Sequence, residues 1–180
     1  MLGAYDGDVL IRLALELLLL TFVRTSELRF ANWGEFEGLD DEAPLWRIPA
    51  ARMKIRRDHL VPLSAQTVGV LKELRSVYPH SKLLFPAPTK SKVISENTMI
   101  YALYRMGYHG RATVHGFRKT ASTVLNEHHF NRDWVEMQLT HVEGSVRSIY
   151  NSAECLPGRR DMMNWWAEYL DEARRQLDRG

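Results

Sequence analysis

His115-Gly116-Phe117-Arg118 begins a segment that continues through Leu139-Thr140-His141 and ends in Arg147-Ser148-Ile149-Tyr150-Asn151. His115 and Arg118 are three residues apart, so a helix places both side chains on one face. If that helix begins near His115, its unpaired N–H groups and its dipole favour an anion beside the two side chains. Tyr150 is a candidate nucleophile wherever positive charge stabilises its phenolate. The segment therefore predicts a site for phosphoryl transfer.

The composition is that of an ordinary globular protein. The chain has 180 residues, 45% of them hydrophobic and 26% charged, which is enough for a substantial core in one large domain or two small ones. The single cysteine, Cys155, excludes an intramolecular disulfide and fits a reducing compartment. The net charge of +2 is too small to indicate a nucleic-acid partner by itself.

The beginning of the chain predicts neither a signal peptide nor a membrane span. It has no basic region followed by a small-residue cleavage site. The apolar run at residues 9–23 contains Arg12 and Glu16 and is shorter than a bilayer requires. We therefore expect a buried helix there.

Positive charge is concentrated in two regions. One basic cluster, which follows the acidic residues 35–42, consists of Arg52, Lys54, Arg56 and Arg57. The other spans residues 105–119 and includes Lys119. Such clusters can hold a polyanion, although a basic cluster is more often only a solvated surface.

The residue pattern predicts a mainly α fold with a small antiparallel β-sheet or hairpin. We expect helices at residues 9–23, 27–31, 64–77, 95–107, from 115, 131–139, 145–150 and from 157 onward. Residues 33–37 alternate and predict a strand. Residues 45–49 and 59–63 predict a hairpin with Lys54 near its tip. Glu27 is close enough in sequence to hold the guanidinium of Arg24.

The order of these motifs resembles the catalytic domain of the tyrosine recombinases, the phage integrase family, and is most similar to integrases of prophages and genomic islands. The motifs that carry the resemblance are Thr21-Phe22-Val23-Arg24 with Glu27-Leu28-Arg29, Trp33, Trp46-Arg47-Ile48-Pro49, Met53-Lys54 with His59-Leu60-Val61-Pro62-Leu63, Phe85-Pro86, His115-Gly116-Phe117-Arg118, Leu139-Thr140-His141 and Tyr150-Asn151. Two departures are Thr25-Ser26, where Pro-Gly is common, and Thr140, where a smaller residue usually precedes the histidine. Neither departure removes a reacting group.

The resemblance implies six catalytic residues: Arg24, Lys54, His115, Arg118, His141 and Tyr150. It implies that the two arginines clamp the scissile phosphate and that His141 adds a hydrogen bond. His115 then serves as acid or base and as an anion ligand. Tyr150 attacks phosphorus to give a 3′-phosphotyrosine and a free 5′-hydroxyl, while Lys54 protonates the departing oxygen. This chemistry needs neither a metal nor another cofactor.

The resemblance also implies a partner and an organisation. The partner is double-stranded DNA at attachment sites, contacted in addition by Arg56, Arg57, Lys119 and Arg147. Residues 1–180 are expected to form a single catalytic domain, with the family's N-terminal core-binding and arm-binding domains absent from this chain. A full-length protein is expected to act as a homotetramer on DNA in the bacterial cytoplasm, at the nucleoid. We expect the isolated chain to be a monomer.

Three other classes remain open at this point. A type IB topoisomerase shares the chemistry, but the motif spacing and the C-terminal segment Trp166-Ala167-Glu168-Tyr169-Leu170, which resembles the family's tail, favour an integrase. A DNA-binding regulator on the same fold is disfavoured because every catalytic position is filled. A metal-dependent hydrolase has little support, since His128 and His129 point about 100° apart on a helix.

Overall fold

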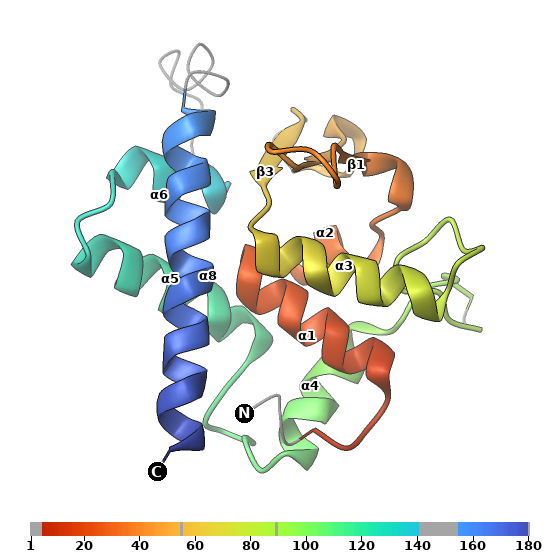
Figure 1. Cartoon of the computed structure of the whole chain (residues 1–180). Helices are drawn as coiled ribbons and strands as arrows, with labels where there is room; N and C mark the ends of the chain where they lie inside the picture. Colours follow the sequence, from red (N-terminus) through yellow and green to blue (C-terminus); the bar gives the residue numbers. More distant parts are fainter. Residues whose placement is uncertain (1–4, 55, 89, 141–154, 180) are drawn as a thin grey trace.

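The structure is a computed structural model, and it describes residues 5–54, 56–88, 90–140 and 155–179. In that part of the chain helices make up most of the molecule, and a small sheet lies at one end, above α2 and α3 in Figure 1. The helices are α1 (Val9–Thr21), α2 (Thr25–Arg29), α3 (Ala65–Val77), α4 (Glu96–Arg105), α5 (Val114–Glu127), α6 (Arg132–Gln138) and α8 (Leu156–Asp178). Helix α8, blue in Figure 1, runs along one side of the molecule, with α5 and α6 beside it. None of the described helices is long and apolar enough to cross a membrane.

The sheet has three antiparallel strands in the order β1 (Phe36–Glu37), β2 (Leu45–Ile48) and β3 (His59–Pro62). The register places Ile48 opposite His59 at the loop end of the β2–β3 hairpin. Between these two residues the chain forms a 3₁₀ turn, η3 (Ala50–Arg52), and then the turn that carries Lys54. The predicted hairpin and the mainly α fold are confirmed.

The strand predicted at residues 33–37 is wrong for its first part. Trp33–Glu35 form a 3₁₀ helix, η2, and only Phe36–Glu37 pair with β2. The side chain of Asn32 accepts a hydrogen bond from the backbone N–H of Gly34 at 3.1 Å, which favours a turn over an extended chain. Glu35 is consequently directed inward, where the indole of Trp46 donates to it at 2.9 Å.

Polar side chains cap the N-termini of several helices. The side chain of Asp8 accepts the backbone N–H of Leu10 at 2.8 Å, satisfying a donor that the helix itself leaves unpaired. In the same way, Ser64, Ser95 and Asn131 cap the N-termini of α3, α4 and α6. Helix α4 ends just before Gly107, which adopts a φ of +81° that favours glycine.

The apolar side chains form two buried clusters. The larger one lies among α1, the sheet, α3 and α4. The second lies among α5, α6 and α8 and consists of Phe22, Ala121, Leu125, Val135, Leu139, Met162, Met163 and Trp166. Phe22 follows α1 with a left-handed φ of 39° and packs edge-on against Trp166. The chain therefore turns between the two clusters immediately before Arg24.

Candidate active site

Arg118 joins the ends of two helices. Its side chain extends from α5 and is almost fully buried. Nη1 donates to the carbonyl of Phe22 at 2.5 Å, after α1, and Nη2 donates to the carbonyl of Leu139 at 2.6 Å, after α6. Burial and then the nearby charge of Arg24 lower the pKa of Arg118 to about 10, with Glu27 opposing the shift. The guanidinium is therefore still positively charged at neutral pH.

Arg24 is held at the start of α2 by a buried carboxylate. Its backbone N–H donates to Oε2 of Glu27 at 2.7 Å, and its Nη1 donates to Oε1 of Glu27 at 2.8 Å. Glu27 is only 3% exposed, so solvent screens this ion pair far less than a surface pair. The expectation that Glu27 holds the guanidinium is confirmed.

Thr140 provides the second anchor of Arg24. Nη1 of Arg24 donates to the hydroxyl of Thr140, while Nη2 makes only a 3.5 Å contact with the Thr140 carbonyl. Thr140 has a φ of 54°, which is unusual for a β-branched residue. A glycine would relieve this backbone strain but would remove the hydroxyl that contacts Arg24. The departure noted in the sequence is thus part of the site.

The two arginines meet where the chain leaves α6. Arg118 contacts the carbonyl of Leu139 and Arg24 contacts the next residue, Thr140. His141 follows directly in the sequence. His141, Arg147 and Tyr150 lie outside the described residues, so their predicted roles rest on the sequence.

The remaining predicted residues lie at the surface. His115 is exposed in the first turn of α5, whose N-cap Thr113 accepts the N–H of Gly116 at 2.9 Å. Arg118, on the same helix, is buried, so the two residues share a face but lie at different depths. Exposed positions are also found for Lys54, Arg56, Arg57 and Lys119. Their cationic groups reach solvent, where a polyanion can approach.

Arg52, the first member of the predicted basic cluster, is a structural residue instead. Its Nη1 donates to the carbonyl of Glu27 at 2.9 Å, and its Nη2 pairs with the carboxylate of Glu35. Burial raises the pKa of Glu35, and hydrogen bonds from Trp46 and Arg52 oppose that change. The pair ties the hairpin that carries Lys54 to α2. The sequence alone does not show whether an arginine in a basic cluster is a structural residue, as Arg52 is, or a solvated cation.

His59 is a buried histidine that the sequence identified only as part of a motif. Burial lowers its pKa well below the ordinary 6.5, and the positive charges of Arg159, Arg118 and Arg24 lower it further. A hydrogen bond to the backbone of Gln138 opposes this shift. We therefore assign the neutral imidazole to the folded protein at neutral pH.

The lowered pKa of His59 predicts an acid-dependent stability. Below pH 6.5 the unfolded chain binds a proton that the folded chain excludes, so stability falls as the pH falls through that range, with a slope of up to about 1.4 kcal/mol per pH unit. Urea titrations from pH 7 to pH 5 measure this slope. His59→Gln is expected to flatten it, and His80→Gln, at the surface, is the matched control. Equal slopes for His59→Gln and the wild type would contradict the assignment.

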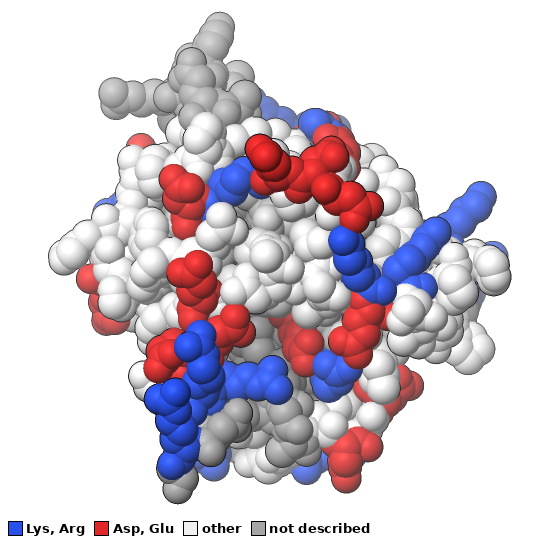
Figure 2. All heavy atoms as spheres, viewed as in Figure 1, with Lys and Arg blue, Asp and Glu red and all other residues white. Residues whose placement is uncertain are grey.

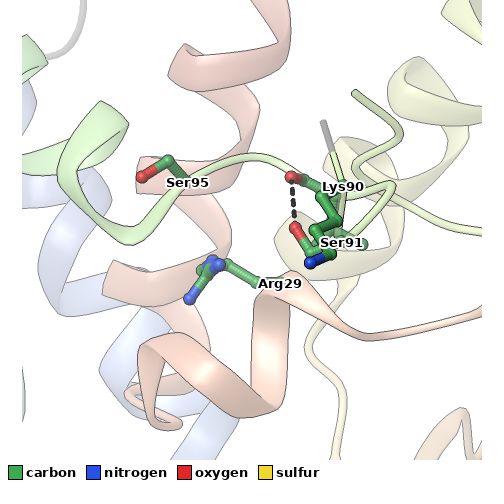
Figure 3. Close-up of a pocket in the computed structure, with 5 residues that line it drawn as sticks. Arg29, Lys90, Ser91 and Ser95 are labelled. Atoms are coloured by element: carbon green, nitrogen blue, oxygen red, sulfur yellow. Dashed lines mark hydrogen bonds between the residues drawn. The ribbon is translucent and has the colours of Figure 1, made fainter. Parts of the chain in front are cut away.

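A basic hollow lies one short helix away from Arg24. It is lined by Arg29, Lys90, Ser91, Val93 and Ser95. Figure 3 shows Arg29, on α2, on one side and Lys90, Ser91 and Ser95, on the loop before α4, on the other. Nε of Arg29 donates to the carbonyl of Ile94 at 2.7 Å, which fixes the guanidinium at the wall. The hollow was not predicted from the sequence, because its two cations, Arg29 and Lys90, are far apart in the chain.

The face formed by α3 and α8 has a different character. Figure 2 shows acidic and basic groups interspersed over it, with basic groups gathered at the C-terminal end of α8. This face offers no continuous basic surface to a polyanion. Within the described residues, no group of three or more His, Cys, Asp or Glu side chains is arranged to hold a metal ion.

Comparisons with known proteins identify the family and the fold. The model of the Phage integrase family matches residues 4–155. The integrase of Enterobacteria phage P4 is 45% identical over 188 residues, which cover 94% of this chain and 42% of that protein. The prophage integrase IntS of Escherichia coli (strain K12) is 41% identical over 174 residues, covering 95% and 44% respectively. The chain thus spans less than half the length of these curated relatives.

A solved structure shares the fold. The XerH site-specific recombinase, described in a pre-cleavage complex with its difH substrate, superposes with a TM-score of 0.62 at 18% identity. The match covers 85% of this chain and 49% of that one. The fold is that of the tyrosine recombinase catalytic domain. The chain belongs to the phage integrase family, and the resemblance found in the sequence is confirmed.

Proposed function

We propose that the chain is the catalytic domain of a site-specific DNA recombinase, an integrase carried by a prophage or a genomic island. The observation that carries the proposal is the meeting of Arg24 and Arg118 at the exit of α6, directly before His141. Two guanidinium groups fixed beside each other suit the non-bridging oxygens of one phosphodiester. Family membership supports the same reaction.

The geometry leaves each arginine with donors for a phosphate. A guanidinium has five N–H groups, and Arg118 directs one from each terminal nitrogen at a backbone carbonyl. Arg24 directs Nη1 at Glu27 and Thr140, and its Nη2 makes a 3.5 Å contact with the Thr140 carbonyl. The described residues therefore fix both guanidinium planes without using all of their donors.

Tyr150 attacks the phosphorus in the proposed reaction. A phenol has a reference pKa of about 10, so roughly one in a thousand is ionised at neutral pH. Positive charge fixed in advance stabilises both the phenolate and the developing charge on the phosphate. Lys54 lies on an exposed turn and protonates the departing 5′ oxygen. The 3′-phosphotyrosine conserves the energy of the broken bond, so rejoining requires no nucleotide cofactor.

The partner in this proposal is double-stranded DNA at an attachment site. The XerH structure contains a DNA substrate, which supports DNA as the ligand of this fold. Exposed cations at Arg56, Arg57 and Lys119, together with Arg147, contact the sugar–phosphate backbone. We place the parent protein at the bacterial nucleoid, acting as a tetramer on paired sites, with residues 1–180 as a single domain that alone is a monomer.

Trapping on a nicked duplex tests the proposal. The duplex carries the junction between the prophage or genomic island and the host DNA. A nick close to the cleavage point lets the short fragment released by cleavage diffuse away. We expect an SDS-stable protein–DNA adduct that forms equally in EDTA. No adduct, or one that requires Mg²⁺, would contradict the proposal. Relaxation of supercoiled plasmid lacking the site would instead favour the topoisomerase alternative.

The hollow beside α2 predicts a modest effect on DNA affinity. Lys90→Gln removes one cation from the wall that faces Arg29, so the slope of log affinity against log salt is expected to become shallower by roughly one. Fluorescence anisotropy over a salt series measures it. Lys72→Gln is the charge-matched control. Lys72 is an exposed lysine on α3 that pairs with Asp40. A shift with Lys72→Gln as large as that with Lys90→Gln would argue against the hollow as a phosphate site.

A further inference from the structure

Arg159 is a buried cation that the proposed mechanism does not use. It lies near the start of α8 and is 2% exposed. Burial lowers its pKa to about 10, so it is charged at neutral pH. Within the described part of the chain its Nη2 donates to two acceptors, the carbonyl of Leu60 at 2.6 Å and Oε1 of Gln138. Both of these acceptors are neutral, and burying a charge against neutral groups is unfavourable in itself, which points to a role beyond packing.

Gln138 extends the contacts of Arg159 to the end of α1. Its side chain is fully buried, with Oε1 accepting from Arg159 and Nε2 donating to the carbonyl of Thr21 at 3.1 Å. This relay from Arg159 through Gln138 to Thr21 runs alongside the contacts of Arg118. Thr21 precedes Phe22, and Gln138 precedes Leu139, so each carbonyl that Arg118 binds is one residue from the relay.

The second acceptor of Arg159 belongs to the hairpin. Leu60 is in β3, next to His59, whose pKa the charge of Arg159 also lowers. The tight packing of α8 on α6 fixes the distance that Arg159 has to span. Gly158 shows how close the two helices are, because a Cβ there would lie 2.2 Å from the ring of Trp134. One guanidinium therefore contacts α6 and β3 directly and α1 through Gln138.

We propose that Arg159 is a positioning residue for DNA cleavage, acting through Gln138 on the two carbonyls that orient Arg118. The inference rests on the proposed function, because it concerns the rate of the same reaction. Among the described residues, the side-chain hydrogen bonds that would still join the exits of α1 and α6 without the relay are those of Arg118 and Arg24, the groups that must align with the phosphate. A misplacement of about 1 Å is enough to slow a reaction on the order of a hundredfold.

The hydrogen bonds suggest a conservative variant that restores the relay. Both donations come from Nη2 alone, and Nε is buried without a hydrogen-bond partner among the described residues. The ammonium of Arg159→Lys keeps the charge and brings donors towards the two acceptors, which restores at least part of the relay, whereas Arg159→Met supplies no donor. Gln138→Met breaks the same relay without removing a charge. Arg160→Met is the matched control, since Arg160 is on the same helix but donates to the carbonyls of Pro44 and Ala43.

The test is single-turnover cleavage of the nicked junction duplex by the full-length parent protein. The amplitude reports the fraction of folded protein, and the rate constant reports alignment of the site. We expect Arg159→Met and Gln138→Met each to lower the rate constant on the order of a hundredfold. The double variant is expected to be no slower than either single one, since both break one relay. Arg159→Lys is expected to stay within about tenfold of the wild type, and DNA affinity by anisotropy to change less than threefold in all variants.

Each outcome decides the proposal. A slow Arg159→Met, a rescued Arg159→Lys and an unaffected Arg160→Met would support it. Loss of amplitude with an unchanged rate constant would overturn it in favour of a purely structural role, as would equal rates for the lysine and methionine variants. If Arg159→Met does not fold, Gln138→Met and the lysine variant decide alone. Absence of any adduct with the wild type would instead overturn the proposed function itself.

Discussion

Arg118→Lys is expected to slow DNA cleavage on the order of a hundredfold or more, the usual effect of losing one electrostatic contact to a transition state. Arg118 uses two separate nitrogens to reach the carbonyls of Phe22 and Leu139 and still has donors for a phosphate. A lysine has one nitrogen at one place. It can bind a carbonyl or a phosphate, but it cannot hold both carbonyls and align a phosphate at once.

The rate constant for single-turnover adduct formation measures this effect. Arg111→Lys makes the same exchange at an exposed position whose guanidinium lies over the ring of Tyr108, and it should leave the rate unchanged. A rate constant for Arg118→Lys within about threefold of the wild type would show that the contact of two guanidinium nitrogens with the two carbonyls is unnecessary. The assignment of Arg118 to the phosphate clamp would then be wrong.

Arg24→Lys is expected to produce a loss of similar size, on the order of a hundredfold, for a different reason. Nη1 of Arg24 is committed to Glu27 and Thr140, and the phosphate donor in our account is Nη2. A lysine at this position takes the place of Nη1 and leaves nothing at the position of Nη2. The folding stability of the Arg24→Lys variant should be nearly unaffected, because a lysine can keep the ion pair with Glu27.

Glu27→Gln provides the comparison for Arg24. It retains the shape of the side chain but replaces a carboxylate that accepts both the backbone N–H and Nη1 of Arg24. We expect a smaller loss, about tenfold, because Arg24 is less firmly held but is still present. The same kinetic assay compares the two. A fully active Arg24→Lys beside an inactive Glu27→Gln would assign the essential role to Glu27 instead.

Much of the scaffold could be predicted because it depends on local patterns. The caps at Asp8, Ser64 and Ser95 follow from short-range hydrogen bonding, and the hairpin follows from two β-prone runs around a polar turn. The family motifs also identified Arg24 and Arg118. The structure brings these two residues together across 94 positions of sequence, counted as 118 − 24, through the exit of α6.

The parts that the sequence did not predict depend on contacts between distant segments. Arg52 and Arg159 look like surface charges in the sequence, but each is held by acceptors on other elements of the fold. The turn at Trp33–Glu35 replaces a strand because Asn32 offers a competing hydrogen bond. Whether a given cation is a solvated group or an internal tie depends on the packing of helices, which composition and periodicity do not specify.

The most direct test of the account locates the DNA on the protein. Trypsin digestion of the trapped adduct, followed by mass spectrometry, identifies the modified peptide and the polarity of the linkage. Cleavage after Arg147 and Arg159 releases a peptide, residues 148–159, whose single tyrosine is Tyr150. We predict a nucleotide joined through its 3′-phosphate to that peptide and no adduct with Tyr150→Phe. A 5′-linkage, attachment to another tyrosine, or an adduct that survives Tyr150→Phe would contradict the proposed reaction.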